Sequence, residues 1–215
     1  MPLSAAIFDL DGVIVDTVPI HFKAWQRMFG EYGKAFTFDD YKRKVDGIPR
    51  MDGARAVLTE LTEEELKTAA AKKQSYFIEA LGNEDVPTYE TTIKLIDDLL
   101  ADGIKVAVIS SSKNCPDILK RIGLYERLDT VISGSDIKRG KPDPEIFLMA
   151  AQRLYTSPDE SLVFEDAVLG VKAAMNAGMK CVGIDRYGDP RRLSGANIIV
   201  SDLDEVDLAK LKALF

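Results

Sequence analysis

Residues 5–17 read AAIFDLDGVIVDT, an apolar run that leads into two aspartates, Asp9 and Asp11, two positions apart. A short apolar run of this kind predicts a buried strand. Two carboxylates this close repel each other unless a proton or a cation lies between them. The two aspartates therefore belong either to a solvent-exposed turn or to a site where carboxylates share a metal ion. The rest of the chain has to distinguish these two interpretations.

Short apolar runs alternate with amphipathic segments over most of the chain. This alternation predicts an α/β fold, a Rossmann-like parallel sheet with helices on both faces. Gly103, Gly123 and Gly178 stand where helix C-terminal glycines belong, and Pro144 stands where a first-turn proline belongs. The expected strands are 5–8, 105–110, 130–133, 161–165, 180–184 and 198–200, and the expected helices are 90–101, 116–122, 144–154 and 169–177.

One stretch, from about Val18 to Leu81, shows only helical patterning. Phe22, Trp25 and Phe29 recur there on one face of a first helix, and residues 62–81 predict a second. We therefore expect an inserted helical cap domain, residues 17–85. It interrupts a core domain made of residues 1–16 and 86–215.

Composition excludes several classes of protein. The 215 residues carry 28 Lys and Arg against 35 Asp and Glu, a net charge of −7. Nucleic acids and anionic membranes reward a basic surface, so neither is expected as a partner. Two cysteines, Cys115 and Cys181, predict no disulfide framework. Without a signal-like or membrane-spanning segment, we expect a cytoplasmic protein.

Chemically versatile side chains follow four of the predicted strands. In a doubly wound sheet, ligands bind beyond the carboxyl ends of the strands, so these side chains are expected to meet at one edge. Each of these motifs, taken alone, has an ordinary structural explanation: a turn, a polar loop, a helix cap or a solvated lysine. Their joint occurrence favours a site. They are Asp9 and Asp11, then Ser110–Asn114 in the sequence SSSKN, then Lys141, and finally Glu165 and Asp166.

The chemistry of this set is self-consistent. Asp9, Glu165 and Asp166 are hard oxygen donors of the kind that Mg²⁺ prefers. Ser110 and the N–H groups that open the following helix suit a phosphate, and Lys141 would neutralise its charge. An aspartate can attack phosphorus, and a second aspartate can move the proton.

These motifs resemble the haloacid-dehalogenase-like superfamily. Its Asp-x-Asp-Gly signature is met by Asp9, Asp11 and Gly12, and its other motifs by Ser110, Lys141 and the pair Glu165–Asp166. The second aspartate points to its phosphatases and phosphomutases. The helical insertion resembles the cap of the β-phosphoglucomutase-like branch. The resemblance implies that Asp9, Asp11, Glu165 and Asp166 hold the metal, and that Asp9, Asp11, Ser110 and Lys141 are catalytic.

The resemblance also implies a substrate-binding set. The segment VDTVPIHFKAW supplies Thr17, His21 and Trp25, with His21 tuning Asp11 or contacting sugar hydroxyls. The segment DGIPR is similar to the cap substrate loop, and there Arg50 would grip the phosphate that is not transferred. Lys72 matches a cap lysine by its distance from Tyr76, with Lys73 as a close competitor. The other expected contacts are Gly47, Ile48, Ser111, Ser112, Lys113 and Asn114.

The function that this resemblance implies is a β-phosphoglucomutase reaction in a monomer. Phosphate would move between C1 and C6 of a glucose phosphate through an aspartyl-phosphate and glucose 1,6-bisphosphate, with Mg²⁺ as cofactor. A Mg²⁺-dependent phosphatase of a small sugar phosphate is the alternative, and a non-catalytic phosphate-binding module is the third. The chain departs from the family pattern at Glu90 and Thr91, at Pro49 and at Gly53. These departures bear on the substrate rather than on the phosphoryl chemistry.

Overall fold

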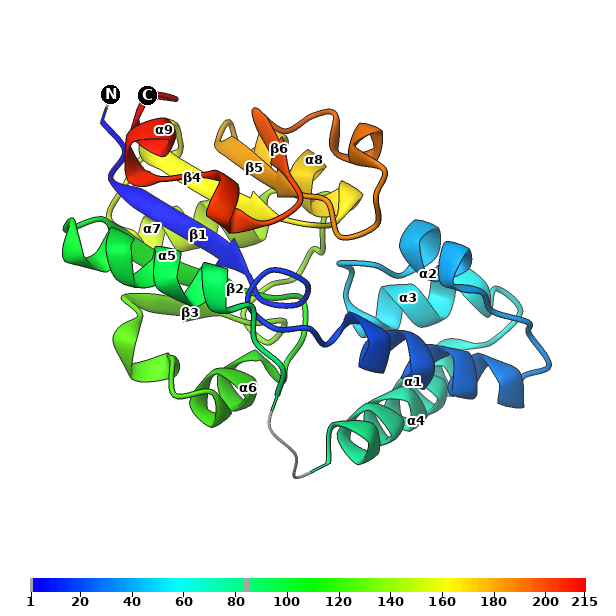
Figure 1. The fold of residues 1–215 in the computed structure, drawn as a ribbon. Coiled ribbons are helices and arrows are strands. Elements are labelled where there is room, and N and C mark those ends of the chain that lie inside the picture. The colour runs from blue at the N-terminus through cyan, green and yellow to red at the C-terminus, as the bar shows by residue number, and fades with distance from the viewer. Residues whose placement is uncertain (1, 83–85) are drawn as a thin grey trace.

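The computed structural model describes residues 2–82 and 86–215. Within these residues the chain forms a parallel sheet of six strands in the order β3-β2-β1-β4-β5-β6. Figure 1 shows this sheet with helices on both sides, and helices α1–α4 as a second body beside the strand ends. The parallel α/β architecture confirms the sequence prediction. The strands are β1 Ala5–Asp9, β2 Lys105–Ile109, β3 Thr130–Ile132, β4 Ser161–Glu165, β5 Lys180–Ile184 and β6 Ile198–Val200.

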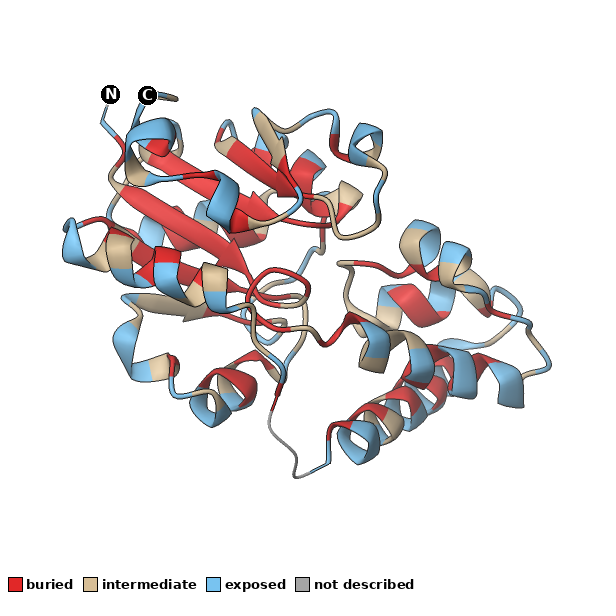
Figure 2. Cartoon of the chain, in the orientation of Figure 1, coloured by how far each residue is buried: buried red, intermediate tan, exposed pale blue. Residues whose placement is uncertain are grey.

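Strand β1 lies in the middle of the sheet and is buried on both faces. Successive side chains of a strand point to opposite faces. Ala6 and Phe8 accordingly join one hydrophobic cluster, and Ala5 and Ile7 join another. Figure 2 shows the central strands as the most buried part of the core. Helices α5 (Glu90–Ala101), α6 (Cys115–Arg121) and α9 (Leu208–Lys212) contribute to the first cluster, and α7 (Glu145–Leu154) and α8 (Val168–Asn176) to the second.

The cap helices pack around a third hydrophobic cluster. Trp25 and Phe29 stack with their ring centroids 5.1 Å apart, and Ala69 packs in the same cluster. Thr62 begins the longest of these helices with a capping box, in which the Glu65 carboxylate accepts the Thr62 N–H at 2.8 Å. The four helices are α1 Val18–Glu31, α2 Phe38–Lys44, α3 Arg50–Val57 and α4 Glu63–Leu81.

The observed boundaries differ slightly from the expected ones. Strand β1 runs through Asp9, and β2 ends at Ile109, which leaves Ser110 in the following loop. Pro144 is the N-cap of α7 rather than a residue of its first turn. The cap contains α2 and α3 in addition to the two helices expected. The division into residues 1–16 and 86–215 against 17–85 stays a prediction, and positions 83–85 lie outside the described residues.

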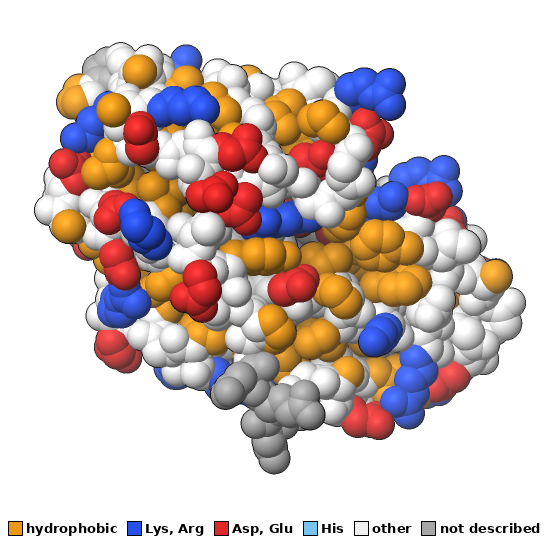
Figure 3. Space-filling model, viewed as in Figure 1, with side chains coloured by type: hydrophobic (Ala, Val, Ile, Leu, Met, Phe, Trp, Pro, Cys, Tyr) orange, Lys and Arg blue, Asp and Glu red, His pale blue; other side chains and the backbone are white. Residues whose placement is uncertain are grey.

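Acidic and basic side chains are mixed on the face that Figure 3 shows, over both bodies. Among the helices of the described ranges, none has the length and apolar character needed to cross a bilayer.

Candidate active site

The register of the sheet brings the predicted residues to one edge. Strand β1 lies between β2 and β4, and its Asp9 aligns with Ile109 while its Phe8 aligns with Phe164. Ser110 and Glu165 are the next residues along β2 and β4. Both therefore reach the carboxyl edge on either side of Asp9, where a doubly wound sheet binds its ligands.

A cavity of about 150 Å³ lies where this edge meets the cap. Core and cap both contribute to its wall, so a ligand bound there is enclosed by the two bodies. Four other predicted residues do not line the cavity but form hydrogen bonds to residues that do: Thr17, Asn114, Lys141 and Glu165. Lys72 forms no such bond, because it pairs with Glu31. The predicted residues that line the cavity are Asp9, Asp11, His21, Trp25, Gly47, Ile48, Arg50, Ser110, Ser111, Ser112, Lys113 and Asp166.

Lys141 is buried between two carboxylates. Its Nζ donates to Asp9 Oδ1 at 2.6 Å and also to Glu165. Burial opposes the charged ammonium, but the two carboxylates outweigh it and raise the pKa of Lys141 above its ordinary value. Burial raises the pKa of Asp9 well above its usual range, against the attraction of Lys141. Lys141 therefore opposes the effect of burial on Asp9 by supplying the opposite charge.

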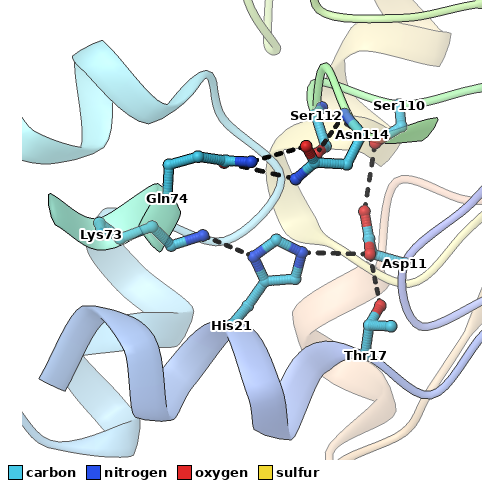
Figure 4. A network of polar contacts seen from close by, with 8 residues as sticks. All are labelled: Asp11, Thr17, His21, Lys73, Gln74, Ser110, Ser112 and Asn114. Carbon is cyan, nitrogen blue, oxygen red and sulfur yellow. Dashed lines mark hydrogen bonds and ion pairs between the residues drawn. The ribbon is translucent and has the colours of Figure 1, made fainter. Parts of the chain in front are cut away.

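Asp11 sits at the centre of a hydrogen-bond network that joins cap and core (Figure 4). One of its oxygens, Oδ1, accepts from Thr17 and lies 3.2 Å from His21 Nε2, and the other accepts from Ser110 at 3.1 Å. Burial opposes ionisation, but His21, Thr17 and Ser110 together lower the pKa of Asp11 to about 2. Asp11 is thus ionised in this arrangement.

His21 connects Asp11 to a cap lysine. Its Nδ1 lies 2.7 Å from Lys73 Nζ, and its ring stacks on Phe77 with the centroids 4.1 Å apart. Burial and the neighbouring ammonium lower the pKa of His21. A neutral imidazole that accepts from Lys73 at Nδ1 must carry its proton on Nε2, the atom that faces Asp11. Lys73 therefore fixes the tautomer that donates to Asp11.

The prediction that Lys72 binds substrate is wrong. Lys72 pairs with Glu31 at 2.8 Å, and 44% of its side chain is exposed. Adjacent helical residues point about 100° apart, so a one-residue error moves a side chain to another face. Lys73 lines the cavity instead, with only 4% of its surface exposed, and burial lowers its pKa to about 7.

Gln74 is a cavity residue that the sequence argument missed. Its Nε2 donates to Asn114 Oδ1 at 2.7 Å, and its Oε1 accepts from Arg50. Ser112 Oγ in turn accepts the Asn114 N–H at 3.2 Å. Gln74 thus joins the cap residue Arg50 to the SSSKN loop of the core. Its place next to Lys73 on α4 is the only signal that pointed to it.

Asp166 is the carboxylate at this edge whose surroundings favour a bound cation. Oδ2 of Asp166 is buried without a hydrogen-bond partner. Burial and the charges of Asp46, Glu165 and Asp9 raise the pKa of Asp166 well above its usual range. A cation beside Asp166 would supply the missing partner and relieve this repulsion. The residues present therefore fit a hard divalent ion.

Two predicted metal ligands are already occupied by other partners. Glu165 contacts Lys141 with one oxygen and accepts the Ala167 N–H at 2.8 Å with the other. Both oxygens of Asp11 accept hydrogen bonds. The geometry therefore does not support the Glu165 and Asp11 side chains as ligands, and leaves Asp9 and Asp166. No cluster of three or more His, Cys, Asp or Glu suited to a metal occurs in the described ranges, so waters and phosphate would complete the shell, as Mg²⁺ prefers.

Glycine is required where the first loop passes Asp166. Gly12 has φ +83°, and a Cβ built on it would lie 2.0 Å from Asp166 Oδ2. A side chain at this position would occupy the space of the carboxylate. Gly12 therefore belongs to the site through the room that it leaves for Asp166.

The fold and this edge of the sheet define a capped α/β enzyme of the phosphotransferase or phosphatase kind. A family model described as haloacid dehalogenase-like hydrolase matches residues 6–184, and the chain belongs to this family.

Relatives within the family include both mutases and phosphatases. The chain is 32% identical to a β-phosphoglucomutase of Bacillus subtilis, over 97% of this chain and 94% of that protein. It is 33% identical to a phosphorylated carbohydrates phosphatase of Thermotoga maritima, over 83% of each. A crystal structure of β-phosphoglucomutase from Clostridium difficile superposes with a TM-score of 0.88 at 28% identity, and the match covers 98% of this chain and 96% of that one.

Proposed function

We propose that the protein is a β-phosphoglucomutase, which interconverts β-D-glucose 1-phosphate and glucose 6-phosphate with Mg²⁺ and glucose 1,6-bisphosphate. One observation carries this proposal. Arg50 and Lys113 line the cavity, and in the described ranges neither forms an ion pair. Burial alone lowers the pKa of Arg50, with no carboxylate to oppose it. This surplus positive charge suits a second phosphate, apart from the one that reacts at Asp9.

Asp9 is the nucleophile in this proposal. Lys141 contacts Oδ1, so Oδ2 attacks phosphorus and forms the aspartyl-phosphate. The bond from phosphorus to the sugar oxygen breaks, and that oxygen takes the proton that Asp11 accepted in the other half of the reaction. Mg²⁺ held by Asp9 and Asp166 would neutralise charge on the transferring phosphoryl group. Lys141 would add positive charge beside Asp9, and its bond to Oδ1 keeps the nucleophile in place.

Asp11 moves the proton. When a sugar hydroxyl attacks the aspartyl-phosphate, its proton passes to the Asp11 carboxylate, which is ionised in this arrangement. Thr17 and His21 come from the cap side, so the network forms only while the cap lies against the core. Cap contacts therefore complete the base when substrate is enclosed and water is excluded.

A phosphatase that acts on a small sugar phosphate is the second candidate. The similarity to the Thermotoga maritima phosphatase favours it. It would use the same Asp9, Asp11 and Lys141, and water would replace the second sugar phosphate as acceptor.

A coupled assay on β-glucose 1-phosphate with Mg²⁺ and a trace of glucose 1,6-bisphosphate tests the proposal. The assay follows glucose 6-phosphate and free phosphate together. Rapid formation of glucose 6-phosphate with little free phosphate is the expected result. Free phosphate as the main product, or hydrolysis of other phosphomonoesters alone, would reject the mutase in favour of the phosphatase.

A further inference from the structure

Gly140 of the core and Pro49 of the cap fit together without space for any other side chain. Gly140 lies in the loop between β3 and α7, one residue before Lys141. A Cβ built on Gly140 would lie 2.1 Å from Cδ and 2.4 Å from Cγ of Pro49. The next nearest atom is the Pro49 nitrogen at 3.6 Å, an ordinary contact. The proline ring therefore fills the place where a side chain at position 140 would stand.

Neither partner can move aside easily. The ring of Pro49 is tied to its own backbone, so it has no rotamer that would clear the space. Pro49 is also the N-cap of α3, and its carbonyl accepts the Gly53 N–H at 3.0 Å. On the other side, the Gly140 carbonyl accepts the Asp143 N–H at 3.0 Å, and Lys141 is buried against Asp9.

This contact lies in the cap segment that carries Arg50. Within that segment, the Gly47 carbonyl accepts from Ser111 Oγ at 2.9 Å. A Cβ on Gly47 would lie 3.2 Å from the Ala167 Cβ, so the segment also passes close to the core there. Arg50 directly follows Pro49 and lines the cavity. The Pro49 ring fills the space that a side chain at position 140 would need. How closely the ring approaches Gly140 therefore sets the position of Arg50.

We propose that the fit of Pro49 into Gly140 determines whether the phosphoryl group on Asp9 passes to a sugar hydroxyl or to water, an inference that rests on the proposed mutase function. In both reactions the acceptor oxygen bonds to phosphorus, the bond from phosphorus to Asp9 breaks, and the acceptor proton passes to Asp11. Only the sugar phosphate needs Arg50 in place, because only it brings a second phosphate. Pro49 and Gly140 are positioning residues in this scheme.

Three variants test the inference: Gly140→Ala, Pro49→Ala and the two combined. In Gly140→Ala the ring must withdraw from 2.1 Å to the 3.4 Å of an ordinary contact, a shift of about 1.3 Å. A displacement of about 1 Å can cost about a hundredfold in rate. We expect glucose 6-phosphate formation to fall by about that factor relative to hydrolysis of p-nitrophenyl phosphate. Pro49→Ala alone is expected to lower the ratio less, since it creates a gap but no clash.

The double variant provides the rescue. With the ring removed, the two clashing carbons are gone, and the residue 49 nitrogen lies 3.6 Å from the new Cβ, an ordinary contact. The ratio of glucose 6-phosphate formation to hydrolysis should therefore return toward that of Pro49→Ala. Gly30→Ala is the matched control, because a Cβ there meets nothing within 4 Å, and it should leave the ratio unchanged. An unchanged ratio in Gly140→Ala, or a double variant no better than Gly140→Ala, overturns the inference. If Gly140→Ala fails to fold, the double variant decides: transfer at the level of Pro49→Ala supports the fit, and its loss overturns it.

Failure of the proposed function is distinguishable from failure of this inference. Trp25, the only tryptophan in the sequence, lines the cavity from the cap, and its fluorescence can report glucose 6-phosphate entering the site. If the parent protein hydrolyses but does not transfer, the mutase proposal fails while this readout still applies. A fluorescence response that is lost in Gly140→Ala and regained in the double variant supports the fit. Equal responses in all variants overturn it.

Discussion

Replacing Lys73 by methionine removes the ammonium group that faces His21 while keeping an unbranched side chain against Trp25 and Phe77. The ammonium lies 2.7 Å from His21 Nδ1, and about 5 Å from the centroids of the two rings. Lys72→Met is the matched control one residue away, since Lys72 pairs with Glu31 outside the cavity. The two variants make the same chemical change, and only the first alters the site.

The magnitude follows from what His21 loses. A buried nitrogen without its donor costs about 1–3 kcal/mol, enough for the imidazole to change its tautomer or orientation. Either change removes the Nε2 proton from the contact with Asp11. A correctly positioned acid or base contributes about a hundredfold to ten-thousandfold to rate. We expect kcat for glucose 6-phosphate formation to fall by about a hundredfold in Lys73→Met, and to stay within about twofold in Lys72→Met.

The titration of Lys73 gives a second measurement. Its pKa of about 7 in the folded protein compares with an ordinary value of 10.5. Between these values the unfolded chain binds a proton that the folded chain has released. The Lys73 contribution to the free energy of unfolding therefore rises with pH, by at most about 1.4 kcal/mol per pH unit. Urea unfolding at pH 7 and pH 9 should show this rise in the parent and in Lys72→Met, but not in Lys73→Met.

Equal activities in the two variants would refute the assignment of Lys73, as would a larger loss in Lys72→Met. Parallel pH dependence of unfolding in the parent and in Lys73→Met would show that Lys73 is not buried as the geometry requires. Trp25 fluorescence in each variant checks that the cap still folds, because this residue packs in the cap cluster.

Three further substitutions address the other parts of the site. Asp9→Asn should abolish turnover and phosphoenzyme formation, measured by mass spectrometry of the intact protein, and appreciable remaining activity would reject Asp9 as nucleophile. Arg50→Ala should impair mutase turnover more than hydrolysis of p-nitrophenyl phosphate, and equal losses would exclude a grip on the second phosphate. Gln74→Ala removes a bond of 2.7 Å to Asn114, worth about 1 kcal/mol, and should raise KM about fivefold with a smaller change in kcat. A fall in kcat alone would reject this role for Gln74.

The core half of the site could be predicted from the sequence because its geometry follows from the sheet. Once the alternation of strands and helices predicts a parallel sheet, residues just beyond the strands must meet at one edge. Asp9, Ser110 and Asp166 line the cavity for this reason. A one-residue error at a strand end, as at Ser110, moves a loop residue by a few ångströms and leaves it at the same edge.

The cap half was less predictable because it depends on helical phase and on contacts between bodies. Gln74 reaches Asn114, forty positions away, and no local pattern encodes that distance. The space beside Gly140 is filled by Pro49, which belongs to the cap and lies far from it in the sequence. The metal ligands depend on which carboxylate oxygens already have hydrogen-bond partners. Both oxygens of Glu165 have partners, whereas Asp166 Oδ2 has none, and the sequence of this acidic pair does not show the difference.

The sequence of α4 does distinguish Lys73 from Lys72 by its pattern of apolar residues. The buried positions of α4 include Ala69, Ala70, Lys73 and Phe77, spaced by the three or four residues that place side chains on one helix face. Lys73 is thus a cation on an apolar stripe, whereas Lys72 lies off it. A lysine is rarely fully buried unless it is paired, so a lysine in phase with an apolar stripe calls for a partner. The partner is His21, whose Nε2 lies 3.2 Å from Asp11, so a lysine in phase with the apolar stripe marks the part of α4 that connects through His21 to Asp11.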